Sequence, residues 1–201
     1  ASSVVVVEEW HGRDRTRTAT HLAESAQILR ALLAGEKTDF SGECASSKGY
    51  KLRLDAVEGL ITIAAFGPAA VRAAARHADR MLLNMVTPLS VAALRDQLIR
   101  AAEKAGRATP EIAIWLPCAV NPQRETIDQL KRGIVGYLAA PGYGEMMMQA
   151  GFEDLVNYAR TRPHPRELLA AMPDKLISAI GLVGDLSAVQ ARVDEYRDAG
   201  A

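Results

Sequence analysis

Three times in this chain, a short and mostly apolar run ends in a small or polar residue, then proline, then an amphipathic stretch. The three junctions are Gly67-Pro68, Thr87-Pro88 and Asn121-Pro122. Proline is favoured at the first position of a helix, because its missing N–H would have no partner there and its φ is already helical. Gly, Thr and Asn are all accepted as N-cap residues. The repeat therefore predicts buried strands alternating with helices, which is the pattern of a parallel α/β fold.

Apolar periodicity and the positions of glycine and proline define the expected elements. We expect an extended run at Val4–Glu8, strands at Leu60–Phe66, Arg80–Val86 and Glu111–Val120, and helices at Thr20–Leu33, Gly67–Ala78, Pro88–Ala105 and Pro122–Ala139. Residues 37–58 are polar, contain an alternating stretch at Tyr50–Leu54, and predict an excursion with a small hairpin or an edge strand. From Tyr143 to Ala199 the pattern is mostly helical, with Leu182–Gly184 opening the last helix.

Composition narrows the class of protein. A chain of 201 residues with 49% apolar residues suits a single globular domain with a substantial core. Lys plus Arg (24) equals Asp plus Glu (24), whereas a nucleic-acid binder usually carries a basic excess. The apolar runs are too short to span a bilayer, and the first residues lack the basic segment of a signal peptide. We therefore expect a cytoplasmic protein that binds neither nucleic acid nor membranes.

The two cysteines, Cys44 and Cys118, lie far apart in the chain. They form no C-x-x-C pair, so neither a zinc site nor a disulfide framework is expected. Cys118 falls inside an expected buried strand, where a thiol is inert. No pair of histidines has the spacing of metal ligands.

The strand-to-helix junctions are the best candidates for a ligand site. In parallel α/β folds they gather at the carboxyl edge of the sheet, where the positive end of each helix favours an anion such as phosphate. Gly67 lets an anion approach the backbone, the small Ala69 and Ala70 leave their N–H groups uncovered, and Thr87 adds a hydroxyl one strand over. A helix cap without a ligand is the alternative, and Asn121-Pro122 is interpreted only as a cap.

Other chemistry-bearing side chains have two interpretations each. His11, beside Trp10, either donates a proton in a pocket or is solvated on an anchored loop, and we favour the loop. Met146–Met148 either line an apolar pocket or pack a helix into the core, and we favour the core. Arg160, Arg162 and Arg166 either meet an anionic ligand or occupy a solvated turn, which is the default.

The order and spacing of several segments across nearly the whole chain carry a family resemblance. These segments are Val5–Gly12, Ile28–Glu36, Asp39–Glu43, Ala64–Pro68, Arg76–Asp79, Leu82–Pro88, Tyr137–Tyr143, Ala150–Phe152 and Leu182–Gly184. Together they resemble the luciferase-like monooxygenase family, specifically the branch that uses the deazaflavin coenzyme F420.

The resemblance implies a (β/α)8 TIM barrel that is incomplete in this chain, forming one partial domain over residues 1–201. It also implies a flavin or deazaflavin phosphate held near the loops after the middle strands. The matching cofactor-binding positions here are Gly67, Pro68, Ala69, Asn84, Val86 and Thr87. The family usually has Ala-Asp-Gly where this chain has Asp79 followed by Arg80. Its catalytic residues lie mostly in strands that precede this chain, so none is carried over.

The function implied by the resemblance is hydride transfer between coenzyme F420 and a small organic substrate by an enzyme that forms homo-oligomers. In such enzymes the cofactor carries the redox chemistry, while the protein binds and orients it. One alternative is an FMN-dependent monooxygenase of the same family. Another is a non-catalytic fragment that binds a phosphate-bearing ligand or associates with itself, because an unclosed parallel sheet exposes edges that need a partner.

Overall fold

The computed structural model describes residues 5–57 and 59–201 and contains two compact units. The first unit comprises the residues up to Leu82 together with Leu94–Ala113, and the second comprises Leu83–Ala93 together with Ile114–Ala201. Three elements run from one unit into the other: β4 (Arg80–Asn84), α3 (Pro88–Lys104) and β5 (Glu111–Trp115).

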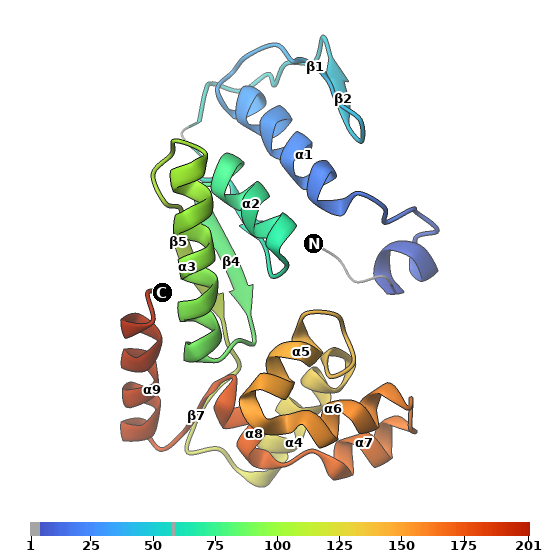
Figure 1. The fold of residues 1–201 in the computed structure, drawn as a ribbon, viewed down its shortest axis with the longest axis vertical. Coiled ribbons are helices and arrows are strands. Elements are labelled where there is room, and N and C mark those ends of the chain that lie inside the picture. The colour runs from blue at the N-terminus through green and yellow to red at the C-terminus, as the bar shows by residue number, and fades with distance from the viewer. Residues whose placement is uncertain (1–4, 58) are drawn as a thin grey trace. The chain divides into compact units, whose positions relative to one another are not determined.

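The first unit is built on two helices that pack against each other, α1 (Thr18–Leu33) and α2 (Pro68–His77) (Figure 1). A short π-helical turn (η1, Val5–Trp10) precedes α1, and an antiparallel hairpin of β1 (Asp39–Ser41) and β2 (Ser46–Lys48) follows it. The buried apolar residues of this unit include Ala26, Ile61, Ile63, Val71, Ala74, Ala75, Met81, Leu98 and Ala102.

A three-stranded sheet has the order β3-β4-β5, with β3 spanning Thr62–Ala64. Strands β3 and β4 are parallel, and Thr62, Ile63 and Ala64 lie opposite Arg80, Met81 and Leu82. Met81 and Leu83 of β4 are completely buried, whereas Leu82 and Asn84 on the other face are only partly covered. One face of this sheet therefore carries the helix-covered core.

The second unit is mainly helical and contains a two-stranded parallel sheet of β6 (Cys118–Val120) and β7 (Leu182–Gly184). Between these strands lie α4 (Arg124–Ile134), η2 (Val135–Tyr137), α5 (Tyr143–Met147), η3 (Met148–Phe152), α6 (Glu153–Arg160), α7 (Pro165–Ala171) and α8 (Asp174–Ala179). Helix α9 (Leu186–Asp198) follows β7. The core includes Leu83, Val86, Val91, Ile134, Leu138, Met147, Val156, Leu176, Ile177 and Ile180. Met146 and Met147 are buried, which confirms that this stretch packs into the core.

Two of the three proline junctions begin helices where the sequence predicts. Helix α2 has Gly67 as its N-cap and Pro68 as its first residue, and α3 starts at Pro88. The third prediction is wrong, because α4 starts at Arg124 with Gln123 as N-cap. Asn121 has a φ of 48° and its amide donates to the carbonyl of Gly184, so this residue prolongs the β6 pairing and delays the helix.

The extended run expected at Val4–Glu8 is corrected by the structure, which has the π-helical turn from Val5 onward; Val4 lies outside the described residues. Backbone groups in a strand need a partner strand. No strand among residues 5–57 and 59–201 pairs with this segment. Its carbonyls are used locally instead, with Gly12 N–H donating to Glu8 and Arg13 N–H to Val7 at 3.0 and 2.9 Å.

The small hairpin expected within residues 37–58 is confirmed: β1 and β2 form it, and it closes where Thr38 N–H donates to the Tyr50 carbonyl at 2.8 Å. Two further strand expectations are corrected. The run Glu111–Val120 divides into β5 and β6 around Pro117, which lacks an N–H to continue a ladder. Leu182–Gly184 is the strand β7, because Leu182 N–H donates to Pro117 O at 2.8 Å, and α9 begins only at Leu186.

Cys118 is exposed, so the expectation of a buried thiol at this position is wrong. Strand β6 pairs with β7 in a sheet of two strands, which gives the side chains of β6 little cover.

The strands of the described part of the chain form sheets of two, three and two strands, and none of these sheets closes into a barrel. No helix in the same described part is both long enough and apolar enough to cross a bilayer.

Candidate functional site: the carboxyl ends of the strands

The N-terminus of α2 presents uncapped backbone amides. Gly67, Pro68 and Ala69 are all exposed, and Gly67 has extended backbone angles. No side chain of the described residues caps this helix end, and the first intrahelical bond runs from Val71 N–H to Gly67 O. A Cβ added at Gly67 would meet no atom within 4 Å. The amides of Ala69 and Ala70 therefore face an open turn, as anion binding requires.

Thr87 is the N-cap of α3. Its Oγ1 accepts a hydrogen bond from Ser90 N–H at 3.1 Å and lies 2.9 Å from Ser90 Oγ. This reciprocal contact satisfies an amide that would otherwise lack a partner. The hydroxyl predicted to meet a ligand thus also serves the helix, and its contribution to a ligand site stays a prediction.

Asn84 ends β4 and contacts a tyrosine from a distant part of the second unit. Its Nδ2 donates to Tyr143 Oη at 3.3 Å, and Tyr137 packs edge-on against the Tyr143 ring with centroids 4.9 Å apart. Burial raises the pKa of the Tyr143 phenol, and this effect outweighs the opposing hydrogen bond from Asn84. Tyr143 therefore remains a neutral phenol at physiological pH.

A short loop holds Tyr143 in place. Gly142 has a φ of 86°, and its amide donates to Glu145 Oε2 at 2.6 Å. Arg160 donates to the other oxygen of Glu145, also at 2.6 Å. Hydrogen bonds from the backbone amides of Glu145 and Gly142, together with the Arg160 charge, lower the pKa of the Glu145 carboxyl. Arg160 is thus engaged in fixing this loop.

Val86 lies deeper than its neighbours in the predicted site. Its side chain is completely buried, and its carbonyl accepts a hydrogen bond from Tyr196 Oη of α9 at 2.5 Å. Burial raises the pKa of Tyr196 to about 12. The part of Val86 that remains for a ligand is its amide, and the predicted role of this residue stays a prediction.

Met85 lies between Asn84 and Val86 and has a φ of 50°. A residue other than glycine, asparagine or aspartate is uncommon in this left-handed region, and such strain is concentrated at functional sites. The Met85 amide donates to the carbonyl of Trp115 at the end of β5, at 3.0 Å. The turn after β4 is therefore held in a costly conformation by the neighbouring strand.

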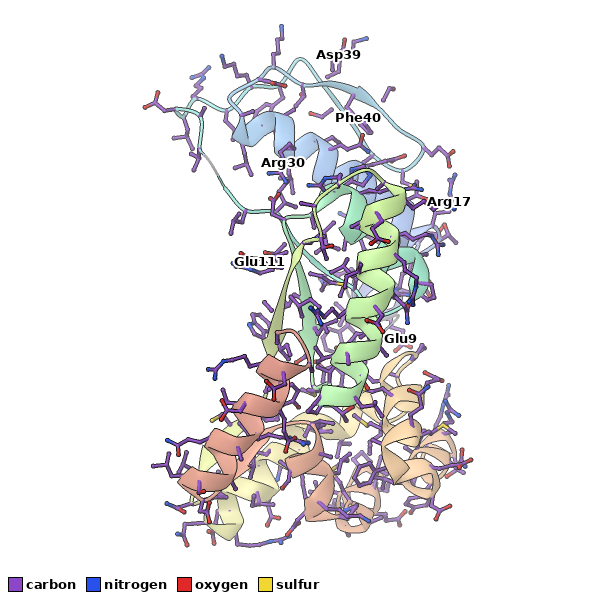
Figure 2. All side chains as sticks on the ribbon, turned by 60° about the vertical axis from the view of Figure 1, so that its left-hand side comes forward. Glu9, Arg17, Arg30, Asp39, Phe40 and Glu111 are labelled. Atoms are coloured by element: carbon purple, nitrogen blue, oxygen red, sulfur yellow. The ribbon has the colours of Figure 1, made fainter. Side chains whose placement is uncertain are left out.

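A groove in the first unit, about 410 Å³ in volume, lies between α1 and α2 and is lined by Arg30, Arg76, Arg107, His77 and Glu36, among others. Two of its arginines have structural partners. Arg30, which extends from α1 (Figure 2), donates to Asp79 at 2.6 Å, and Arg107 donates to the carbonyls of Ala75 and Ala78 at the end of α2. Burial, assisted by the Arg107 and Arg76 charges, lowers the pKa of His77. Because Arg30 pairs with Asp79 and Arg107 binds the last carbonyls of α2, these side chains of the groove serve to hold the fold together.

The departure from the family pattern at Arg80 has a structural role. Arg80 donates through Nε and Nη2 to a single oxygen of Glu111, at 3.1 and 2.7 Å, joining the starts of β4 and β5 (Figure 2 labels Glu111). Asp79 accepts hydrogen bonds from Ile61 N–H and from Arg30. Burial raises the pKa of Asp79, but these bonds and the nearby arginines outweigh it and leave the pKa lowered. Both residues therefore stabilise the amino-terminal edge of the sheet.

Of the predicted site residues, Asn84 ends β4 and Val86 and Thr87 follow it within the second unit, whereas Gly67, Pro68 and Ala69 follow β3 within the first. Tyr143 was not singled out from the sequence, although it lies in a segment that carries the resemblance. Within residues 5–57 and 59–201, no group of three or more His, Cys, Asp or Glu side chains could hold a metal ion.

Parallel strands followed by helices define an α/β protein, and open amides and polar side chains lie at the ends of these strands. A model of the luciferase-like monooxygenase family matches residues 1–201, and the chain belongs to this family. A 5,10-methylenetetrahydromethanopterin reductase of Methanolobus tindarius is 23% identical over 188 residues, covering 90% of this chain and 58% of the relative.

Two solved structures share the fold. The coenzyme F420-dependent tetrahydromethanopterin reductase of Methanopyrus kandleri superimposes with a TM-score of 0.69 at 17% identity, covering 91% of this chain and 55% of its own. An F420-dependent secondary alcohol dehydrogenase in complex with an F420-acetone adduct gives a TM-score of 0.64 at 15% identity, covering 89% and 52%. The chain thus spans a little over half the length of these relatives.

Proposed function

We propose that this chain contributes the coenzyme-binding part of an F420-dependent oxidoreductase that transfers a hydride between coenzyme F420 and a small organic substrate. The observation that carries the proposal is the open, uncapped N-terminus of α2 at Gly67–Ala70 in a member of the luciferase-like monooxygenase family. Support also comes from the relatives, two of which are F420-dependent by name.

The residues fit a phosphate-bearing coenzyme. Ala69 and Ala70 would donate their amides to the phosphate, Gly67 allows its close approach, and Pro68 offers only shape and a carbonyl. Asn84, Val86 and Thr87 would contact the coenzyme after the next strand. When bound, the deazaflavin supplies the hydride chemistry, and the protein supplies position and a dry environment.

The polar side chains after β4 are held in fixed positions by neighbouring residues. Asn84 is held by Tyr143, and Tyr143 is held by the loop that Glu145 and Arg160 fix. Because the raised pKa of Tyr143 keeps its phenol neutral, the Asn84–Tyr143 pair presents hydrogen-bonding groups without a net charge. Such a pair suits an uncharged part of a ligand.

Titration of the full chain with coenzyme F420 and with FMN, followed by the fluorescence of each, tests the proposal. A Gly67→Asp variant gives the sharpest contrast. Replacing glycine by aspartate at the N-cap stabilises α2 by roughly a few tenths of a kcal/mol, yet it places a negative charge where the phosphate would bind. We expect coenzyme affinity to fall at least about tenfold while the unfolding midpoint rises or stays equal. Gly67→Asn is the control, because it adds the same bulk and a comparable N-cap without the charge, and it should lose less affinity than Gly67→Asp. Failure of both coenzymes to bind below millimolar concentration would refute the proposal.

An FMN-dependent monooxygenase is the second candidate, because the family is described as one of monooxygenases. Oxygen reactivity separates the two: a bound reduced deazaflavin should persist in air, whereas reduced FMN should be reoxidised with substrate oxygenation.

The non-catalytic alternative predicts ligand binding or self-association without turnover. Light scattering measures the proposed homo-oligomer and would contradict it by giving the mass of a single chain.

A further inference from the structure

Trp115 ends β5 and is 68% exposed, although it belongs to a strand. An indole is one of the largest apolar side chains, and it dominates the energetics of cores and binding sites when it is covered. An exposed indole at a strand end is therefore a candidate for contact with a ligand.

The hydrogen-bond register places Trp115 beside Asn84. In the β3–β4 pair, Ala65 N–H donates to Leu82 O, and Ala64 lies opposite Leu82. The same pattern recurs one strand further on, where Met85 N–H donates to Trp115 O at 3.0 Å. By the same geometry Asn84 lies opposite Trp115, and neighbouring strands are about 4.8 Å apart with opposed side chains on one face.

Asn84 brings polar chemistry to the same place. Its carboxamide contacts the hydroxyl of Tyr143, whose ring in turn meets the ring of Tyr137. An exposed aromatic face thus stands beside an amide and a phenol that are fixed by partners. Ligand sites combine such apolar walls with a few positioned polar groups.

We propose that the deazaflavin ring of the coenzyme packs against the indole of Trp115, with Asn84 at the polar edge of the ring. This inference rests on the proposed function and assigns a ring-binding residue to the same site. A planar conjugated ring with carbonyl and N–H groups along one edge matches a wall of this composition. Stacking an indole on such a ring also removes the exposed apolar surface from water.

The sequence makes the experiment simple, because the chain has two tryptophans, Trp10 and Trp115. A Trp10→Phe variant leaves Trp115 as the single tryptophan, and it is also the matched control, since Trp10 is 72% exposed. Acrylamide quenching of Trp115 fluorescence is measured with and without saturating F420. Coenzyme affinity is measured independently from F420 fluorescence in Trp115→Leu, Trp115→Phe and Trp10→Phe, and urea unfolding is measured for all three.

We expect F420 to protect Trp115 from acrylamide, Trp115→Leu to weaken F420 binding about three- to tenfold, and Trp115→Phe to retain most of the affinity. Trp10→Phe should bind as the parent does. If F420 binds but leaves Trp115 equally quenchable, or if Trp115→Leu lowers only the unfolding midpoint, the ring assignment is wrong while the proposed function stands. If F420 does not bind the parent chain, both fail.

Discussion

The carboxyl group of Glu24 lies almost where a side chain at Gly42 would be: a Cβ built on Gly42 falls 2.3 Å from Glu24 Cδ. Glu24 is buried, and its oxygens accept hydrogen bonds from the amides of Glu43, Cys44 and Ala45 at 2.7 to 2.8 Å. One side chain of α1 therefore organises the whole turn between β1 and β2. Glycine at position 42 is needed because the carboxylate approaches its backbone so closely.

Gly42→Ala should destabilise the protein by about 1 to 3 kcal/mol, because the added methyl must displace a carboxylate fixed by three hydrogen bonds. Urea denaturation followed by circular dichroism measures the change. Gly133→Ala in α4 is the control, since no atom lies within 4 Å of its added Cβ. Alanine there should stabilise the helix by about 0.5 to 1 kcal/mol. Equal responses at the two glycines would contradict the close approach at Gly42.

Glu24→Gln should lower the unfolding midpoint at neutral pH, because a carboxamide has one acceptor oxygen and turns its NH2 toward donating amides. Burial raises the pKa of Glu24, but the hydrogen bonds from the amides of Cys44, Glu43 and Ala45 outweigh this and leave it lowered. The carboxylate's stabilisation is therefore present above the unfolded pKa of about 4.3 and is lost as pH falls through the lower folded value.

The difference between the parent and Glu24→Gln should accordingly shrink below about pH 4. Unfolding curves at several acidic pH values measure this. Glu103→Gln on α3 serves as control, because Glu103 is exposed and outside the ion pairs of the described residues. A difference that stays constant down to acid pH would show that the charge of Glu24 is irrelevant.

What the sequence predicts well here is local. Thr87 and Pro88 cap and open α3 through contacts within three residues, and Gly35, with a φ of 72°, ends α1 through its own backbone. Capping preferences depend on residues that are adjacent in the sequence, so the starts of α2 and α3 can be predicted from them. The candidate positions at Gly67 and Thr87 could be predicted for the same reason.

Contacts between residues far apart in the chain could not be predicted from the sequence. Asn84 meets Tyr143 across 59 residues, and Glu24 meets the hairpin turn across about 20. Strand β7 exists because it pairs with β6, which precedes it by more than 60 residues; its three residues alone carry no distinct strand signal. Conversely, the β-branched run after Val4 has strong strand propensity and forms a helical turn, because tertiary pairing decides strands.

Thr87→Val should destabilise the protein by about 0.5 to 2 kcal/mol, because it keeps the shape of the side chain but removes the oxygen that caps Ser90 N–H. Thr87→Ser keeps the oxygen and should lie within about 0.5 kcal/mol of the parent. Urea unfolding of the three proteins measures the ranking. A valine variant as stable as the serine variant would mean that the cap contributes nothing to α3.

Tyr196→Phe tests the contact between α9 and the turn after β4. Removing the hydroxyl that donates to Val86 O should cost about 0.5 to 1.5 kcal/mol at neutral pH. Burial raises the pKa of Tyr196 to about 12, despite the nearby charge of Arg192. Because the folded pKa lies above the unfolded value of about 10, the stabilisation is complete below about pH 10 and is lost as pH rises toward 12.

The free energy of unfolding should therefore fall more steeply with pH in the parent than in Tyr196→Phe, by on the order of 1 to 2 kcal/mol between about pH 9 and pH 11.5. Urea titrations at those two pH values give the slopes. Lysines and arginines titrate in both proteins, so only the difference between the slopes reports Tyr196. Tyr158→Phe, at a tyrosine that is 37% exposed on α6, is the control for removing a phenol hydroxyl. Parallel slopes for the parent and Tyr196→Phe would show that the phenol of Tyr196 ionises as freely in the folded chain as in the unfolded one.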